Sequence, residues 1–292
     1  MADHLIRILT SDGTLRAMVC DTTELVREAC LRQGTDITAG IALGRLCTAA
    51  ALMGALLKGG QRLALMIEGN GPLKKLHAET DDQGNVRASV KEPVSGLPPK
   101  NGDFDVAGAL GRAGFLHVVK DLGMKEPYRG TVMLQTSEIA EDLAYYLTTS
   151  EQIPSVVACG VLLGPDGLVA AAGGLLIQAL PPGNPELIAR LEERLKGLSS
   201  ISRILAGGSE PEALLEQLFE GIPFDKVQEI PLRFHCSCNR EQIARLIRTL
   251  GRQDLEALLA ERGEVSVQCE YCRENYGFDA AGVEEIFSKG VS

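Results

Sequence analysis

Two pairs of closely spaced cysteines near the C-terminus constrain this chain more than any other feature. They are Cys236-Ser237-Cys238 and Cys269-Glu270-Tyr271-Cys272, with residues 239–268 between them. Four soft sulfur ligands arranged in two such pairs suit the tetrahedral shell that Zn²⁺ prefers. The four cysteines therefore predict a zinc site. A disulfide pair or free thiols are the alternatives.

The other four cysteines, Cys20, Cys30, Cys47 and Cys159, stand singly among apolar residues. Cys47 lies inside a long apolar run and is predicted to be a packed core thiol. No further role is assigned to these four. His235 stands beside Cys236, but four cysteines already complete a zinc shell, so His235 is left out of the predicted ligands.

The N-terminal sequence and the net charge limit the compartment and the kinds of partner that can be expected. Asp3 stands where a signal peptide would be basic, and the most apolar stretch, residues 46–57, is too short to span a bilayer. We therefore expect a cytoplasmic protein that is not inserted in a membrane. In that compartment thiols stay reduced, so clustered cysteines indicate metal or redox chemistry. The net charge of -10 argues against a general nucleic-acid binder, which needs a basic face.

Residues 1–182 are predicted to form a large α+β domain of mixed sheet and helices. Alternating polarity and turn residues predict strands at 4–10, 14–20, 62–68, 73–80, 86–91, 114–120, 129–136, 156–163 and 168–179. Capping residues and apolar periodicity predict helices at 24–32, 38–58 and 137–149, the last with Ser137 as its N-cap. Apolar residues surround most of helix 38–58, which should therefore be central and buried.

The composition changes at Pro181-Pro182-Gly183, and residues 183–230 are predicted to be a helical linker. Helices are expected at 185–198 and 211–220, and the helical pattern continues to Glu229. From Gly183 to Glu229 there are five basic and nine acidic residues and few large apolar ones. Such a segment needs a neighbour to stay ordered, so it should be the least stable part of the chain.

Residues 231–292 are predicted to be a small zinc-binding domain. A strand at 229–235 leads to the first cysteine pair, helices follow at 240–250 and 252–261, and a strand at 264–268 leads to the second pair before a last helix at 279–288. A unit of about 60 residues rarely has a hydrophobic core large enough to keep it folded, and a bound metal is one of the few other sources of stability.

The same cysteines could also serve as a redox switch. Zinc holds its ligands as thiolates, which are the oxidisable form of cysteine. Either pair could close on itself as a disulfide, expel the metal and remove its contribution to folding. Spacing alone favours an inert structural zinc over such a switch.

Several stretches of the sequence resemble one known family. In the C-terminal unit they are FHCSCNREQIARLIRTLG and CEYCRENYGFD, and in the N-terminal part they include TTELVREAC, ALGRLCTAAALMGALLK, EPYRGTVMLQTSEIAEDLAYYLTTSEQIPS and AAGGLLIQALPPG. The chain is similar over nearly its whole length to the redox-regulated holdase chaperones of the heat shock protein 33 family, also called the 33-kDa chaperonin family.

The resemblance implies a specific function and not an enzyme. Cys236, Cys238, Cys269 and Cys272 would bind one Zn²⁺ in the reduced, inactive protein. Oxidation would join Cys236 to Cys238 and Cys269 to Cys272, release the zinc and unfold both the zinc unit and the linker. The protein would then bind unfolding client proteins without ATP as a cytosolic homodimer, and residues 1–182 would serve client binding and dimerisation.

Two other functions compete with this one. A thiol-disulfide oxidoreductase could use Cys269 and Cys272, although no thioredoxin-like βαβ pattern surrounds them. A zinc-ribbon nucleic-acid-binding protein would also use four cysteines, but the acidic composition disfavours it.

Overall fold

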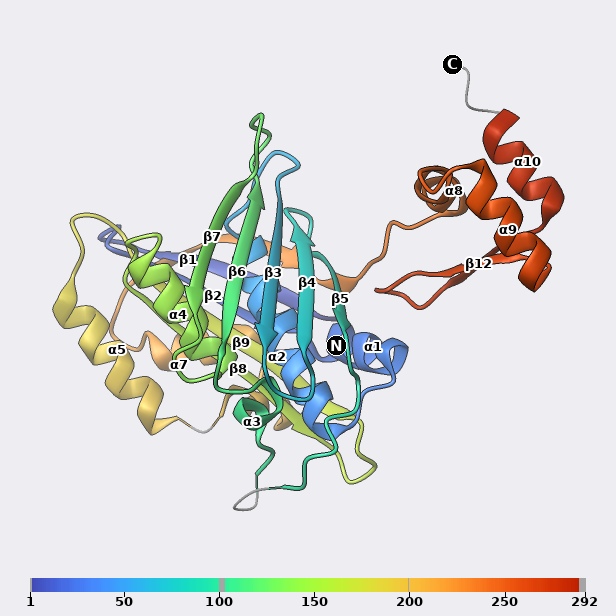
Figure 1. The fold of residues 1–292 in the computed structure, drawn as a ribbon. Helices are drawn as coiled ribbons and strands as arrows, with labels where there is room; N and C mark the ends of the chain where they lie inside the picture. Colours follow the sequence, from blue (N-terminus) through green and yellow to red (C-terminus); the bar gives the residue numbers. More distant parts are fainter. Residues whose placement is uncertain (1, 100–102, 199, 289–292) are drawn as a thin grey trace. The chain divides into compact units, whose positions relative to one another are not determined.

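The chain folds as an α+β protein with two compact units. The structure is a computed structural model that describes residues 2–99, 103–198 and 200–288. The first unit ends at His235 and the second begins at Cys236 (Figure 1). The predicted fold class is confirmed.

One sheet of the first unit has five strands in the order β10-β1-β2-β9-β8, and every neighbouring pair is antiparallel. The strands predicted at 4–10 and 14–20 are confirmed, and they pair as a hairpin. The strands are β1 His4–Thr10, β2 Leu15–Asp21, β8 Ser155–Leu163, β9 Val169–Ala179 and β10 Phe224–Pro231.

The other sheet has six strands in the order β11-β5-β4-β3-β6-β7. Only the short edge strand β11 is parallel to its neighbour, β5. The strands are β3 Arg62–Gly69, β4 Lys75–Asp81, β5 Asn85–Val90, β6 Gly114–Asp121, β7 Tyr128–Met133 and β11 Arg233–Phe234.

Helix α2, Ile37–Gly54, packs between the two sheets (Figure 1). Its side chains belong to one apolar cluster with residues of both sheets, as expected for a helix that is apolar nearly all round. It is long and apolar enough to cross a membrane by composition alone, but 89% of it is buried in the protein core. It ends at Gly54 rather than at the predicted Lys58, because tight turn bonds follow from Leu56 and Leu57.

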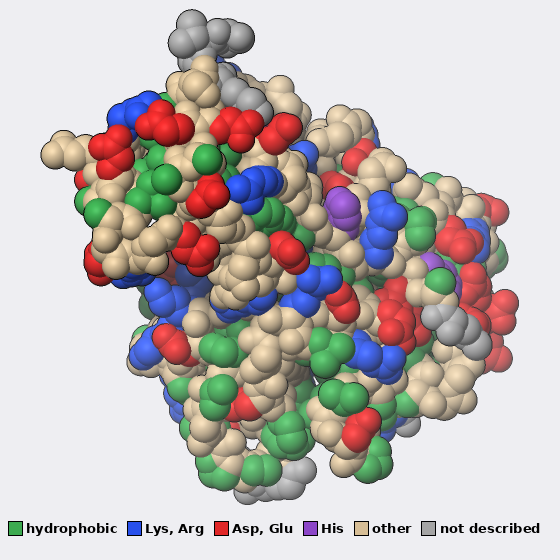
Figure 2. Space-filling view, turned by 90° about the vertical axis from the view of Figure 1, so that its right-hand side faces the viewer, with side chains coloured by type: hydrophobic (Ala, Val, Ile, Leu, Met, Phe, Trp, Pro, Cys, Tyr) green, Lys and Arg blue, Asp and Glu red, His purple; other side chains and the backbone are tan. Residues whose placement is uncertain are grey.

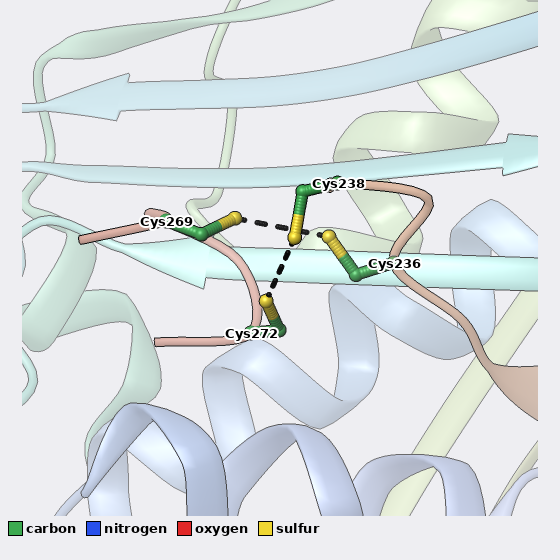
Figure 3. Close-up of side chains that lie close together, drawn as sticks. All are labelled: Cys236, Cys238, Cys269 and Cys272. Carbon is green, nitrogen blue, oxygen red and sulfur yellow. Dashed lines mark hydrogen bonds between the residues drawn. The ribbon is translucent and has the colours of Figure 1, made fainter. Parts of the chain in front are cut away.

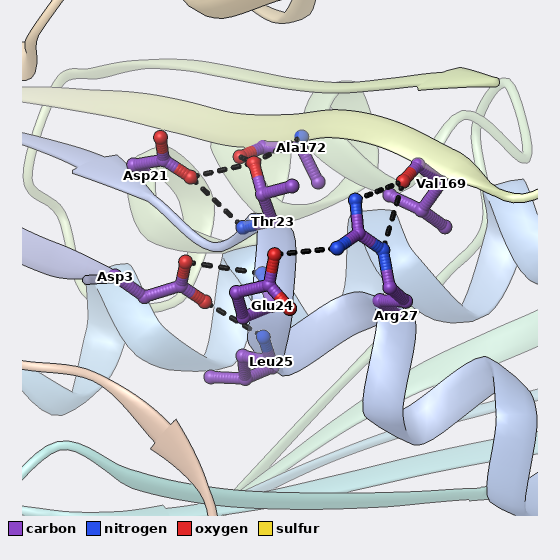
Figure 4. A network of polar contacts seen from close by, with 8 residues as sticks. All are labelled: Asp3, Asp21, Thr23, Glu24, Leu25, Arg27, Val169 and Ala172. Atoms are coloured by element: carbon purple, nitrogen blue, oxygen red, sulfur yellow. Dashed lines mark hydrogen bonds and ion pairs between the residues drawn. The ribbon is translucent and has the colours of Figure 1, made fainter. Parts of the chain in front are cut away.

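Helix α1, Thr23–Gln33, takes its N-terminal cap from a distant part of the chain. The helix predicted at 24–32 is confirmed. The side chain of its N-cap residue, Thr22, makes no capping bond, and the carboxylate of Asp3 accepts hydrogen bonds from the N–H groups of Glu24 (3.0 Å) and Leu25 (2.7 Å) instead (Figure 4). Burial raises the pKa of Asp3 to about 6. These bonds fasten the start of β1 to α1.

The remaining helices of this core are α3 Val106–Leu110 and α4 Ile139–Thr149. Ser137 was predicted to be the N-cap of α4, and this prediction is wrong, because Glu138 occupies that position. Ser137 has a left-handed φ of 63° and donates its hydroxyl to the carbonyl of Gly111 instead. The carboxylate of Asp142 accepts the N–H groups of Gln135 and Thr136 before the helix starts.

Three helices of the predicted linker cover the other face of the five-stranded sheet: α5 Pro185–Gly197, α6 Ile201–Ala206 and α7 Pro211–Leu218. They share a second apolar cluster with β1, β2 and β9, in which Leu214, Leu218 and Phe219 are at most 1% exposed. The prediction of a helical pattern up to Glu229 is wrong beyond α7, because Phe224–Pro231 forms strand β10. The segment is thus more firmly packed than its composition suggested.

The second unit contains α8 Arg240–Arg248, α9 Arg252–Arg262, β12 Val265–Gln268, β13 Asn275–Phe278 and α10 Ala280–Ser288. The predicted helices and the strand β12 are confirmed, whereas β13 was missed. Strands β12 and β13 form an antiparallel hairpin. Among the residues of this unit that the structure describes, the apolar core cluster has seven buried members: Ile243, Ile247, Leu255, Val265, Phe278, Val283 and Ile286.

Candidate metal centre

The first cysteine pair lies in extended chain directly before α8. Asn239 caps this helix, since its side-chain oxygen accepts the N–H of Gln242 at 2.9 Å. The cap fixes where the chain turns from extended to helical and so orients Cys236 and Cys238 just before it.

The second pair lies in the loop of the β12–β13 hairpin. The N–H of Cys269 donates to the carbonyl of Glu274 at 2.9 Å, and the N–H of Arg273 donates to the carbonyl of Cys269 at 3.0 Å. Arg273 has a left-handed φ of 59°. This tight turn brings Cys272 back beside Cys269.

The two pairs meet, and their four sulfur atoms lie within 4.8 Å of one another (Figure 3). The sulfur of Cys236 is 3.7 Å from that of Cys269, and the sulfur of Cys238 is 3.2 Å from that of Cys272. Both of these contacts run between the two pairs. All eight cysteines lie in the part of the chain that the structure describes, and all are free of disulfides.

The donor set fits a zinc ion. Tetrahedral Zn²⁺ with sulfur at about 2.3 Å places its ligands roughly 3.8 Å apart, close to the spacing of Cys236 and Cys269. Burial raises the pKa of Cys238 and of Cys272. The thiols of Cys238 and Cys272 therefore have little tendency to ionise by themselves, whereas a divalent cation would hold its cysteine ligands as thiolates.

Tyr276, which the sequence did not single out, contacts this site. Its hydroxyl lies 3.2 Å from the sulfur of Cys238. The hydrogen bond to Cys238 and burial raise the pKa of Tyr276, so the phenol keeps its proton and can donate to a thiolate. Such outer partners orient metal ligands and adjust their reactivity. Its position four residues after Cys272 gave no signal, because the contact depends on the hairpin register.

His235 is the last residue of the first unit and pairs within that unit. Its N–H donates to the carbonyl of Val86 at 2.9 Å, which continues the pairing of β11 with β5. The group of clustered ligands around Cys236 consists of the four cysteines without His235.

The four single cysteines belong to the core of the first unit. Cys20 and Cys47 are at most 1% exposed. Cys20 and Cys159 flank Gly174 of the strand between them. Burial raises the pKa of all four thiols, to about 11 for Cys30 and about 12 for Cys159, so little reactive thiolate forms.

Comparison with known proteins assigns the family. A family model described as Hsp33 protein matches residues 3–279. The chain belongs to the Hsp33 family. It is 59% identical over 288 residues to a 33 kDa chaperonin of Syntrophotalea carbinolica, with 99% of this chain and all of the relative covered. It is 54% identical to a 33 kDa chaperonin of Geobacter sulfurreducens, with coverage of 98% and 95%.

A solved structure supports the same assignment. The crystal structure of a 33 kDa chaperonin, a heat shock protein 33 homologue of Thermotoga maritima, matches with a TM-score of 0.91 and 36% identity. The match covers 99% of this chain and 98% of the other. The protein is therefore a chaperone of the Hsp33 family and not an enzyme.

Proposed function

We propose that this protein is an ATP-independent holdase controlled by oxidation. In the reduced state Cys236, Cys238, Cys269 and Cys272 hold one Zn²⁺ and the chaperone is inactive. Oxidation releases the zinc, unfolds the second unit and the linker, and exposes a surface that binds unfolding proteins. The observation that carries this proposal is the cluster of four sulfurs in a unit with a very small core.

The small core makes the second unit dependent on its metal. Seven buried apolar side chains support a unit of more than 50 residues, which is little for independent folding. Structural zinc contributes about 10–16 kcal/mol of apparent binding energy in small metal-folded peptides. Losing that contribution would leave the unit unfolded.

Oxidation by peroxide supplies the trigger. Two thiolates give up two electrons to form one S–S bond, and hydrogen peroxide takes these electrons and two protons to become water. We propose the pairs Cys236–Cys238 and Cys269–Cys272. The contacts of Cys236 with Cys269 and of Cys238 with Cys272 join different pairs, but each proposed disulfide closes a short loop and can persist after the unit has unfolded.

The linker supplies the surface. Helices α5–α7 cover an apolar face of the five-stranded sheet that includes Ile6, Ile8 and Val19, all at most 1% exposed. The chain joins this segment to the zinc unit through β10 and the two-residue strand β11. If the linker opens, that face becomes available to the apolar segments of client proteins.

Clients, self-association and location complete the proposal. We propose a homodimer as the active form, acting in the cytoplasm on partly unfolded proteins, with no nucleic-acid or membrane partner. The net charge of -10 supports the absence of a nucleic-acid partner. Acidic and basic side chains are intermixed over the face shown in Figure 2.

The test is to treat the reduced, zinc-loaded protein with hydrogen peroxide under mild heat. Zinc release, free thiols, sedimentation and suppression of the aggregation of a thermally unfolding enzyme are followed together. We expect one zinc per chain to be released, four thiols to be lost, and protection to appear in step. A matched sample kept reduced should protect no client. Oxidised protein that loses its zinc and protects no client would overturn the proposal.

A further inference from the structure

Strand β10 is an edge strand that carries several features which discourage further strand pairing. It lies at one end of the five-stranded sheet, and only Ile230 of its residues is buried. Asp225, Lys226, Glu229 and Pro231 are all exposed. Charges and proline on an edge are the usual protection against unwanted strand addition.

A bulge adds to this protection. Arg7 pairs with Gln228 and Ile8 pairs with Lys226, so Val227 is the extra residue, and it is 50% exposed. A bulge twists an edge and interrupts its regular ladder. The natural edge of this sheet is therefore a poor template for another strand.

Strand β1, the neighbour of β10 in the same sheet, is a good template for pairing with another strand. Its sequence is His-Leu-Ile-Arg-Ile-Leu-Thr, in which Leu5, Ile6 and Ile8 are at most 1% exposed. Its apolar side chains reach both faces of the sheet, since Leu5 belongs to the first cluster and Ile6 and Ile8 to the second. Without β10 it would be a regular apolar edge with unpaired N–H and C=O groups.

Strand β10 is tied to the linker helices, so the two should leave together. Phe224 of β10 packs edge-on against Phe219, which follows α7, with ring centroids 5.7 Å apart. The ammonium of Lys226 lies 3.1 Å from the carboxylate of Glu212 in α7, which also lies 3.5 Å from the imidazole of His4. Opening of α7 removes these contacts and leaves β10 held chiefly by Ile230 and its backbone bonds.

We propose that β10 is an internal placeholder and that the edge of β1 binds client proteins by strand addition. This inference rests on the proposed oxidative opening of the linker. The partner is an extended segment of an unfolding protein, with apolar side chains that match both faces of the sheet. Such a segment gains affinity from main-chain hydrogen bonds and therefore need not have a particular sequence, which suits a chaperone with many clients.

The length of the site follows from the placeholder. Seven residues of β1, from His4 to Thr10, pair with β10. The N–H of Leu232 donates to the carbonyl of Asp3 at one end, and the N–H of Ser11 donates to the carbonyl of Pro223 at the other, both at 2.9 Å. A client segment of about this length can replace β10 completely.

The first test is amide hydrogen exchange of residues 3–11 in the full-length protein. We expect slow exchange in the reduced, zinc-loaded form, faster exchange at part of these amides after peroxide, and slow exchange again when a thermally unfolding enzyme is added. If β1 stays protected after oxidation, or stays fast in a complex that protects the client, strand addition is wrong. Protection that returns without client and increases with protein concentration would mean that β1 pairs with a second copy, and would also overturn the proposal.

The second test is a pair of matched variants, Leu9→Lys and Val227→Lys. Leu9 is half-buried on β1, whereas Val227 is exposed on β10 and leaves with the placeholder. We expect Leu9→Lys to lower client protection several-fold at unchanged zinc release, and Val227→Lys to behave like the parent protein. Equal protection by both variants refutes the site. Failure of zinc release or of protection in the parent protein instead refutes the underlying holdase proposal.

Discussion

Phe219→Ala should activate the chaperone without an oxidant. Phe219 follows α7, is 1% exposed, and packs against Phe224 in the apolar cluster beneath the linker helices. Removing this ring leaves a cavity in the apolar cluster that holds the linker against the sheet. The folded linker should then be open part of the time even with zinc bound.

The magnitude follows from the burial of the ring. Truncation of a fully buried phenylalanine to alanine costs about 3–5 kcal/mol. At about 1.4 kcal/mol per tenfold change, the ratio of closed to open linker falls by a factor of roughly 10² to 10⁴. An opening too rare to detect in the parent protein would thus become a substantial population.

The assay measures protection of a thermally unfolding enzyme by reduced, zinc-loaded protein, with amide exchange over α5–α7 on the same sample. The matched control is Val227→Ala, since an exposed side chain in the same segment should change stability by less than about 0.5 kcal/mol. Zinc content and unfolding of the core of the first unit are checked in both variants. If Phe219→Ala keeps α5–α7 as protected as the control does and remains inactive, the linker is not the element that restrains activity.

Three further outcomes are expected. Tyr276→Phe removes the hydrogen bond to the sulfur of Cys238 and should speed peroxide-driven zinc release several-fold, with unchanged zinc stoichiometry; an unchanged rate would show that the phenol does not restrain the thiolate. Asp3 has a pKa raised to about 6 from an ordinary value of 3.8, so the stability of the parent protein should fall relative to Asp3→Asn as pH rises through 4–6, and parallel urea-unfolding profiles would contradict this. Brief alkylation of the native zinc-loaded protein, read by peptide mass spectrometry, should leave the buried thiols of Cys20 and Cys47 unmodified, and early labelling of either would contradict their burial.

Local patterns were sufficient to predict much of the first unit. The β1–β2 hairpin follows from alternation around a Ser-Asp-Gly turn, and α2 follows from an apolar run closed by glycines. These features depend on a few neighbouring residues, which the sequence displays directly.

The linker could not be predicted in the same way. Strand β10 carries Asp225, Lys226 and Glu229, because an edge strand needs burial at only a few positions and so shows weak alternation. The packing of α5–α7 depends on the partner face supplied by β1, β2 and β9, which are distant in sequence. From sequence alone the linker therefore seemed to have too few apolar residues to pack firmly, because the face that it packs against was not known.

Some residues of the metal centre could likewise be predicted from local sequence, and others could not. Spacing singled out the four cysteines, and the structure brings their sulfurs together. The contact of Tyr276 with Cys238 and the capping of α1 by Asp3 depend on tertiary placement, and no local pattern marks them. The type and spacing of the cysteines were sufficient to predict the ligands, whereas the residues that support them could be identified only from the folded structure.

Whether the four cysteines keep the linker closed is tested most directly by following zinc release and amide exchange of α5–α7 together after peroxide is added to the reduced protein. We expect the linker amides to lose protection as zinc leaves, while α2 in the core stays protected. Zinc that leaves from a protein whose α5–α7 amides remain protected would contradict the claim that the four cysteines keep the linker closed.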